Sequence, residues 1–140
     1  MEINDVITAI SIKLYETFGE AYEIYTESIE QGFKEPSFFI LLLQPEFKQV
    51  VGNRYHETLP FDIHYFGPGY MDAYSKANKL MSEMEYIKLL NGDLLRGTKM
   101  KGEVIDGVLH FFVNYNFHVY KVTDPLDKME DLQLSNGIKR

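Results

Sequence analysis

Asp62 and His64 stand two residues apart in a segment, residues 59–66, that alternates between two kinds of side chain. Residues two apart in a strand point to the same face, so we expect the carboxylate and the imidazole to lie side by side. Such a pair is half of an arrangement that activates a nucleophile. No serine in the chain has the Gly-x-Ser-x-Gly setting of a hydrolase nucleophile. We therefore predict no catalytic residue and interpret the pair as a solvated or interfacial polar pair. A small hydrolase that uses Asp62, His64 and a cross-strand histidine is the alternative from a different class.

The four histidines also raise the question of a metal site. His56 and His64 are eight residues apart, as are His110 and His118. Eight residues span roughly 26 Å along a strand, whereas metal ligands lie about 2 Å from the ion. Only a combination across two strands, such as His64 with His110, could close on one ion. The chain has no cysteine, so we predict no metal and no cofactor.

Two helices and a series of strands must position these residues. Apolar side chains recur at spacings of three and four over residues 3–18 and 71–89, which predicts two helices with one apolar face each. Strands are predicted at residues 22–26, 37–43, 47–55, 59–66, 94–105 and 108–122. Asp106-Gly107 is a strong hairpin signal between the last two strands. The order predicts an α+β fold, a mostly antiparallel mixed sheet with both helices packed on one face.

The last predicted strand has two different faces. Its odd positions, from Leu109 to Val119, are apolar and indicate the core. Its even positions carry histidine, asparagine and aromatic side chains and no carboxylate, a composition typical of a protein–protein contact surface. We predict an assembly interface there, formed by His110, Phe112, Asn114, Asn116, His118 and Tyr120. Cover by another part of the same chain is the competing interpretation.

A polar cluster at residues 53–57 is a second candidate contact surface. Arg54, Tyr55 and His56 are adjacent there, and arginine with tyrosine is a frequent anchor of interfaces. An exposed hairpin explains the cluster equally well.

Length and charge narrow the class of protein. The 140 residues suit one domain, which we place at residues 1–122, with a polar C-terminal tail at 123–140 that orders on assembly. The net charge of −7 and the scattered basic residues argue against specific nucleic-acid binding. The longest apolar run, residues 38–43, is too short to cross a bilayer, and the first residues do not form a signal peptide.

Four stretches of the chain resemble the phage tail terminator family. They are INDVITAISIKLYETFGE, IYTESIEQGFKEPSFFI, VVGNRYHETLPFDIHYF and LLRGTKMKGEVIDGVLHFFVNYNFHVYK. The resemblance covers roughly residues 3–122 and rests on overall pattern, without a catalytic signature. The family occurs in phages and prophages of Gram-positive bacteria and in phage-derived contractile tails such as tailocins.

The resemblance implies a structural role in a virion or tail particle that is assembled in the bacterial cytoplasm. Tail terminators form a ring, typically of six subunits, that caps the tail tube, stops its polymerisation and prepares the head–tail junction. The implied partners are other copies of the chain, the tail tube protein, and the sheath or head-connector protein. Another head–tail joining or neck completion subunit is the alternative within the same class.

Overall fold

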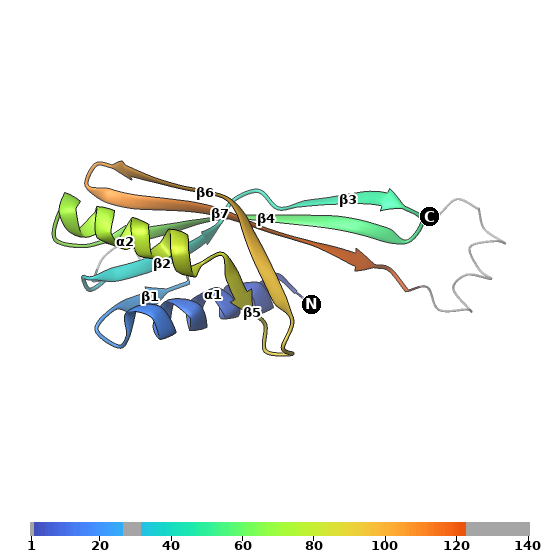
Figure 1. Ribbon diagram of the computed structural model, residues 1–140, viewed down its shortest axis with the longest axis horizontal. Coiled ribbons are helices and arrows are strands. Elements are labelled where there is room, and N and C mark those ends of the chain that lie inside the picture. Colours follow the sequence, from blue (N-terminus) through green and yellow to red (C-terminus); the bar gives the residue numbers. More distant parts are fainter. Residues whose placement is uncertain (1, 27–31, 123–140) are drawn as a thin grey trace.

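The computed structural model describes residues 2–26 and 32–122, and it contains two helices and seven strands within these ranges (Figure 1). In chain order the elements are α1 (Ile3–Phe18), β1 (Glu23–Tyr25), β2 (Ser37–Leu42), β3 (Glu46–Val51), β4 (Arg54–Phe66), α2 (Tyr70–Glu83), β5 (Tyr86–Lys88), β6 (Leu94–Ile105) and β7 (Val108–Tyr120). The tail predicted at 123–140 lies outside the described residues. Neither helix has the length and apolar character needed to cross a membrane.

The strands form one mixed, mostly antiparallel sheet. Their order is β1-β2-β4-β7-β6-β5, and β3 pairs with β4 beyond the end of β2. Only the β1–β2 pair is parallel among these pairings. The predicted α+β class and the mostly antiparallel sheet are therefore confirmed.

Both helices pack on the same face of this sheet. The buried side chains of α1 and α2 meet the odd-numbered residues of β4 and β7 in one hydrophobic core. The fully buried residues of this core include Val6, Ile10, Leu14, Leu59, Phe61, Ile63, Leu80, Phe111, Val113 and Tyr115. The core confirms that the odd side of β7 faces inward, as its apolar composition predicts.

Local signals explain where several elements begin and end. The backbone N–H of Glu2 donates to Asp5 Oδ2 at 2.8 Å, which caps the first turn of α1. Gly19, with a φ of 92°, ends that helix. Asp106 and Gly107 both have positive φ values, 51° and 80°, so the predicted tight hairpin between β6 and β7 is confirmed.

The strand predicted at 47–55 is wrong, because the chain turns within it. Val51 pairs with Arg54, and Gly52 has a φ of 56°, a conformation that glycine adopts easily. The result is a hairpin of β3 with β4, and β4 then runs without a break to Phe66. Residues 53–57 therefore lie at the turn and start of this hairpin, and residues 54–57 are half-buried.

The helix predicted at 71–89 is too long at its C-terminal end. The structure ends α2 at Glu83, and Tyr86–Lys88 forms β5 against β6. Ile87 is buried between two exposed neighbours, which is strand alternation. The number of residues between Leu80 and Ile87 also fits helical spacing, so the apolar pattern alone could not distinguish the end of α2 from β5.

Gly97 gives a first testable prediction. A Cβ atom at this position in β6 would lie 2.7 Å from Val113 Cγ2 and 2.9 Å from the Met84 carbonyl oxygen. Gly97→Ala is therefore expected to cost about 1 to 3 kcal/mol of unfolding free energy through overpacking. Gly102→Ala, in the same strand, meets its nearest atom at 3.4 Å and is the matched control. Urea denaturation of both variants checks this, and equal stability of the two would contradict it.

Candidate assembly interface

The sheet face opposite the helices carries the strip predicted from the last strand. We call His110, Phe112, Asn114, Asn116, His118 and Tyr120 the outer strip. Each of these residues is half-buried or exposed, in alternation with the core residues of β7. Within residues 2–26 and 32–122, neither helix packs on this face. The competing interpretation, a strip fully covered by its own chain, is not what the described residues show.

The neighbouring strand extends the outer strip. Arg54 pairs with Tyr120 and His56 with His118, so these side chains share the outer face. Arg54 Nε lies 3.4 Å from His118 Nδ1. Tyr55 is different, because its position between Arg54 and His56 turns it to the helix-side face. Eight of the nine predicted interface residues therefore share one face, and Tyr55 does not.

The outer strip contains no carboxylate, lysine or arginine. The pKa of His118 is held below its ordinary value by desolvation first, and then by the nearby Arg54 and His56. Asn114 and Asn116 are linked to Thr98 of β6 by long hydrogen bonds of 3.5 Å. The aromatic and amide groups of the outer strip can be covered by a partner without the cost of burying an ion.

An arm of three strands extends beyond both helices (Figure 1). It consists of β3, residues 54–58 of β4 and residues 116–120 of β7. Every residue of β3 is exposed. Among the described residues the arm is covered by a helix on neither face, so both faces and the free edge of β3 are open to contact.

The helix-side face of the arm has the same apolar pattern as the core, but among the described residues no helix covers it. Phe47, Tyr55, Phe117 and Val119 lie on this face by their register. Phe47 and Tyr55 stack with ring centroids 4.8 Å apart, and the Lys121 ammonium lies 4.8 Å from the Tyr55 ring centroid. The sequence predicts both Phe117 and Val119 in the core. Phe117 is partly buried and packs against the core, whereas Val119 lies farther out in the arm, because alternation shows which residues share a face and not how far the helices reach.

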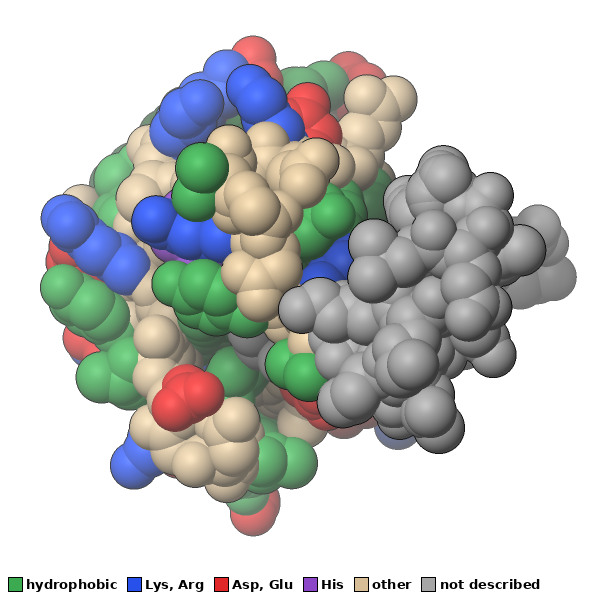
Figure 2. Space-filling model, turned by 90° about the vertical axis from the view of Figure 1, so that its right-hand side faces the viewer, with side chains coloured by type: hydrophobic (Ala, Val, Ile, Leu, Met, Phe, Trp, Pro, Cys, Tyr) green, Lys and Arg blue, Asp and Glu red, His purple; other side chains and the backbone are tan. Residues whose placement is uncertain are grey.

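Figure 2 looks onto the end of the molecule from which the arm projects. Hydrophobic side chains are exposed there, interspersed with basic and acidic ones. The exposed apolar residues of this region include Phe47, Val50, Val51 and Tyr120. Large apolar side chains that a folded chain leaves in water are a common mark of a surface that meets another protein.

The predicted Asp62–His64 pair exists, and a second histidine joins it. Asp62 Oδ2 lies 2.9 Å from His64 Nε2 and 3.1 Å from His110 Nδ1. His64 and His110 are direct cross-strand partners, and their ring centroids are 4.1 Å apart. Among the described residues no serine hydroxyl is hydrogen-bonded to either imidazole. In the part of the chain that the structure describes, no serine nucleophile is thus paired with this cluster.

The Asp62 carboxylate is stabilised by this cluster. Burial alone would raise the pKa of Asp62, but the hydrogen bonds and charges of His64 and His110 outweigh burial, and the pKa is lowered. A carboxyl group whose pKa is lowered in the folded state stabilises the fold at pH values above its pKa in the unfolded chain, which is about 3.9. That stabilisation is lost as the pH falls through the pKa of Asp62 in the folded state.

Asp62→Asn tests this linkage. At neutral pH in buffer with EDTA, the variant is expected to lose about 1.5 to 3 kcal/mol of unfolding free energy, because a charge-assisted hydrogen-bond pair is weakened. The difference from the original chain should shrink as the pH falls below about 4. Denaturation at a series of pH values measures both quantities, and a difference that is constant from pH 7 to pH 2 would contradict the assignment.

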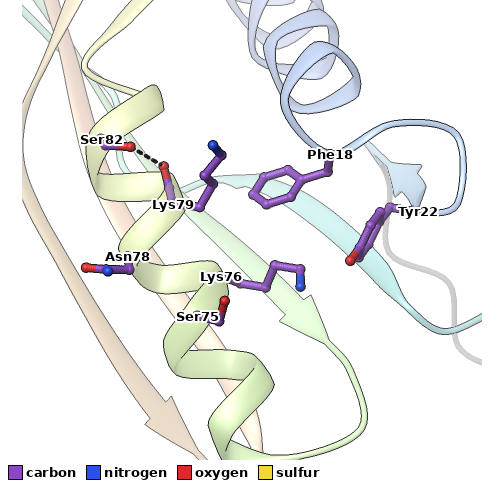
Figure 3. Close-up of a pocket in the computed structure, with 7 residues that line it drawn as sticks. All are labelled: Phe18, Tyr22, Ser75, Lys76, Asn78, Lys79 and Ser82. Carbon is purple, nitrogen blue, oxygen red and sulfur yellow. Dashed lines mark hydrogen bonds between the residues drawn. The ribbon is translucent and has the colours of Figure 1, made fainter.

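An open groove lies between α2 and the end of α1 (Figure 3). It encloses about 540 Å³ and is lined by Phe18, Tyr22, Ser75, Lys76, Asn78, Lys79 and Ser82. Lys76 Nζ bonds Asp72 Oδ1 at 2.9 Å and lies 5.1 Å from the Tyr22 ring centroid. Tyr65 donates to the same aspartate. These contacts tie α2 to the sheet, so Lys76 has a structural role in a groove without a catalytic group.

The fold and its uncovered surfaces are typical of a structural domain that assembles with other proteins. In this α+β domain the described residues leave one sheet face and the arm uncovered by helices.

Comparison with known proteins gives the particular family. The chain matches the family model described as "Phage tail terminator protein" over residues 5–127, and it belongs to this family. None of the curated proteins compared with the chain matches it. The membership confirms the resemblance predicted from the sequence and makes the chain a structural protein of phage tails, which acts in tail assembly or termination and contacts the tail tube.

Proposed function

We propose that the chain is a ring-forming tail terminator. Copies of the chain, six by resemblance to other tail terminators, close into a ring on the end of the tail tube. The ring stops tube polymerisation and prepares the end of the tail for the head connector. Family membership supports the tail-end role, and the uncovered arm is the structural observation that supports the ring.

A closed ring needs two different surfaces on each subunit that fit each other head to tail. The helix-side face of the arm and the outer strip meet this requirement, because both are open, both carry aromatic groups and they lie on opposite faces of the sheet. The free edge of β3 also offers unpaired backbone groups, to which a strand of another chain can hydrogen-bond and so extend the sheet. We assign one ring contact to the helix-side face and edge of the arm, and the other to the outer strip of the neighbouring copy.

The excess of acidic residues fits a ring with an open centre. A net charge of −7 disfavours adhesion to phosphate groups, so nucleic acid could pass through such a ring without being held. We therefore expect no specific nucleic-acid binding. The partners in the proposed role are other copies of the chain, the tube protein and the head connector.

Electron microscopy of particles made without this protein tests the function. We expect tails of abnormal length, or full-length tails that are not joined to heads, because nothing stops the growing tube. Expression of the original chain from a plasmid should restore uniform, joined tails. Normal particles in the absence of the protein would overturn the proposal.

A further inference from the structure

Asp62, His64 and His110 form a compact group of potential metal ligands. One carboxylate oxygen and one ring nitrogen from each histidine lie within 4.8 Å of one another. All three residues come from β4 and β7, the central strands of the sheet, where the register places His64 directly opposite His110. The group is therefore held by the backbone of the most extensively paired part of the fold.

The distances in the group suit a tetrahedral ion. Ligands about 2.0 to 2.2 Å from Zn²⁺ lie roughly 3.4 Å apart in tetrahedral geometry. The present separations from Asp62 Oδ2, 2.9 Å and 3.1 Å, are those of hydrogen bonds. Tetrahedral ligation lengthens these two separations by a few tenths of an ångström, and rotation of the histidine side chains brings their ring nitrogens, now within 4.8 Å of each other, to ligand spacing.

The buried carboxylate lacks a full set of partners. Only 9% of the Asp62 side chain is exposed, and its Oδ1 atom is buried without a hydrogen bond. Its ion-pairing partners among the described residues are the two histidines. The nearby Lys101 ammonium lies instead 5.4 Å from the Phe112 ring centroid. A buried carboxylate in this position favours a cation, because an uncompensated buried charge is costly.

We propose that Asp62, His64 and His110 bind one divalent transition-metal ion, with Zn²⁺ as the best match. Imidazole ligands select zinc-like ions, whereas Mg²⁺ and Ca²⁺ prefer oxygen ligands throughout. His64 and His110 are 21% and 18% exposed, so the ion reaches the site from the outer face of the sheet, and water occupies the fourth position. This inference replaces the sequence-based expectation of no metal, and it does not depend on the proposed ring.

Titration of the full-length chain with Zn²⁺ after removal of metal by chelation tests the site. Calorimetry is expected to show one ion per chain, and Co²⁺ in its place should give the visible absorption of a tetrahedral site. Asp62→Asn, His64→Ala and His110→Ala should each weaken binding at least tenfold. The melting temperature of the original chain should rise with Zn²⁺ concentration, since the ion binds the folded state.

A second histidine pair in the same strands supplies the control. His56 and His118 are also cross-strand partners, with ring centroids 4.9 Å apart, but Arg54 stands beside them in place of a carboxylate. The double variant His56→Ala/His118→Ala should bind Zn²⁺ as the original chain does. Loss of binding in this double variant alone, equal affinity in Asp62→Asn, or less than one ion per chain would each overturn the proposal. Circular dichroism of every variant verifies the fold, and His64→Gln replaces any variant that does not fold.

Discussion

Phe47→Asp is expected to leave the chain folded and to abolish tail termination. Phe47 is 50% exposed in the edge strand β3, on the helix-side face of the arm. An aspartate there places a charge in the proposed contact between ring subunits, where a central aromatic residue typically contributes about 2 kcal/mol or more. That loss corresponds to a roughly 30-fold weaker contact at each interface. Electron microscopy of particles made with the variant should show the same tails as particles made without the protein.

Met71→Asp is the matched control for this result. Met71 is 83% exposed on α2, away from the arm, so the same kind of change meets solvent there. Particles with this variant should have normal tails. The thermal stability of both purified variants should stay close to that of the original chain, with about 1 kcal/mol lost in Phe47→Asp from the stacking on Tyr55. Uniform tails with Phe47→Asp would contradict the assignment of the arm as a ring contact.

Phe111→Ala is expected to remove about 3 to 5 kcal/mol of unfolding free energy. Phe111 is fully buried in β7, between β4 and β6, and its loss leaves a cavity in the centre of the core. Domains of this size are stable by only about 5 to 15 kcal/mol, so the variant should be partly unfolded at moderate temperature. Urea denaturation followed by circular dichroism measures the change.

The adjacent phenylalanine provides a comparison on the other face. Phe112 belongs to the outer strip and is only half-buried. Phe112→Ala should cost about 1 kcal/mol or less, since little apolar surface leaves the interior. If the two variants were equally stable, the division of β7 into a core face and a contact face would be incorrect.

Periodicity predicted those parts of the fold that depend on neighbouring residues. The spacing of apolar residues gives α1, and Asp106-Gly107 gives the hairpin of β6 with β7, because both are decided within a few residues of sequence. The Gly52 turn was missed because one glycine between apolar residues also fits a weakened strand. The strand β5 was missed because Leu80, Met84 and Ile87 continue the helical spacing.

The geometry of the candidate contact surfaces could be predicted only in part. Alternation in β7 separates the outer strip from the core, and it correctly identifies that Asp62 and His64 share a face. It does not give the register of β4 against β7, two strands that are more than forty residues apart, so it cannot bring His110 to Asp62. The extent of the arm depends on where the helices end in space, which no local pattern contains.

The unbroken pairing of β4 with β7 links the tip of the arm to the interior of the molecule. The same ladder runs from Arg54 opposite Tyr120 to Tyr65 opposite Leu109, so there is no hinge at which the arm could swing as a separate part. We expect the arm to be rigid relative to the rest of the domain. We therefore expect a force that a neighbouring molecule applies to the tip of the arm to pass along the paired backbones of β4 and β7 to the strands beneath the helices.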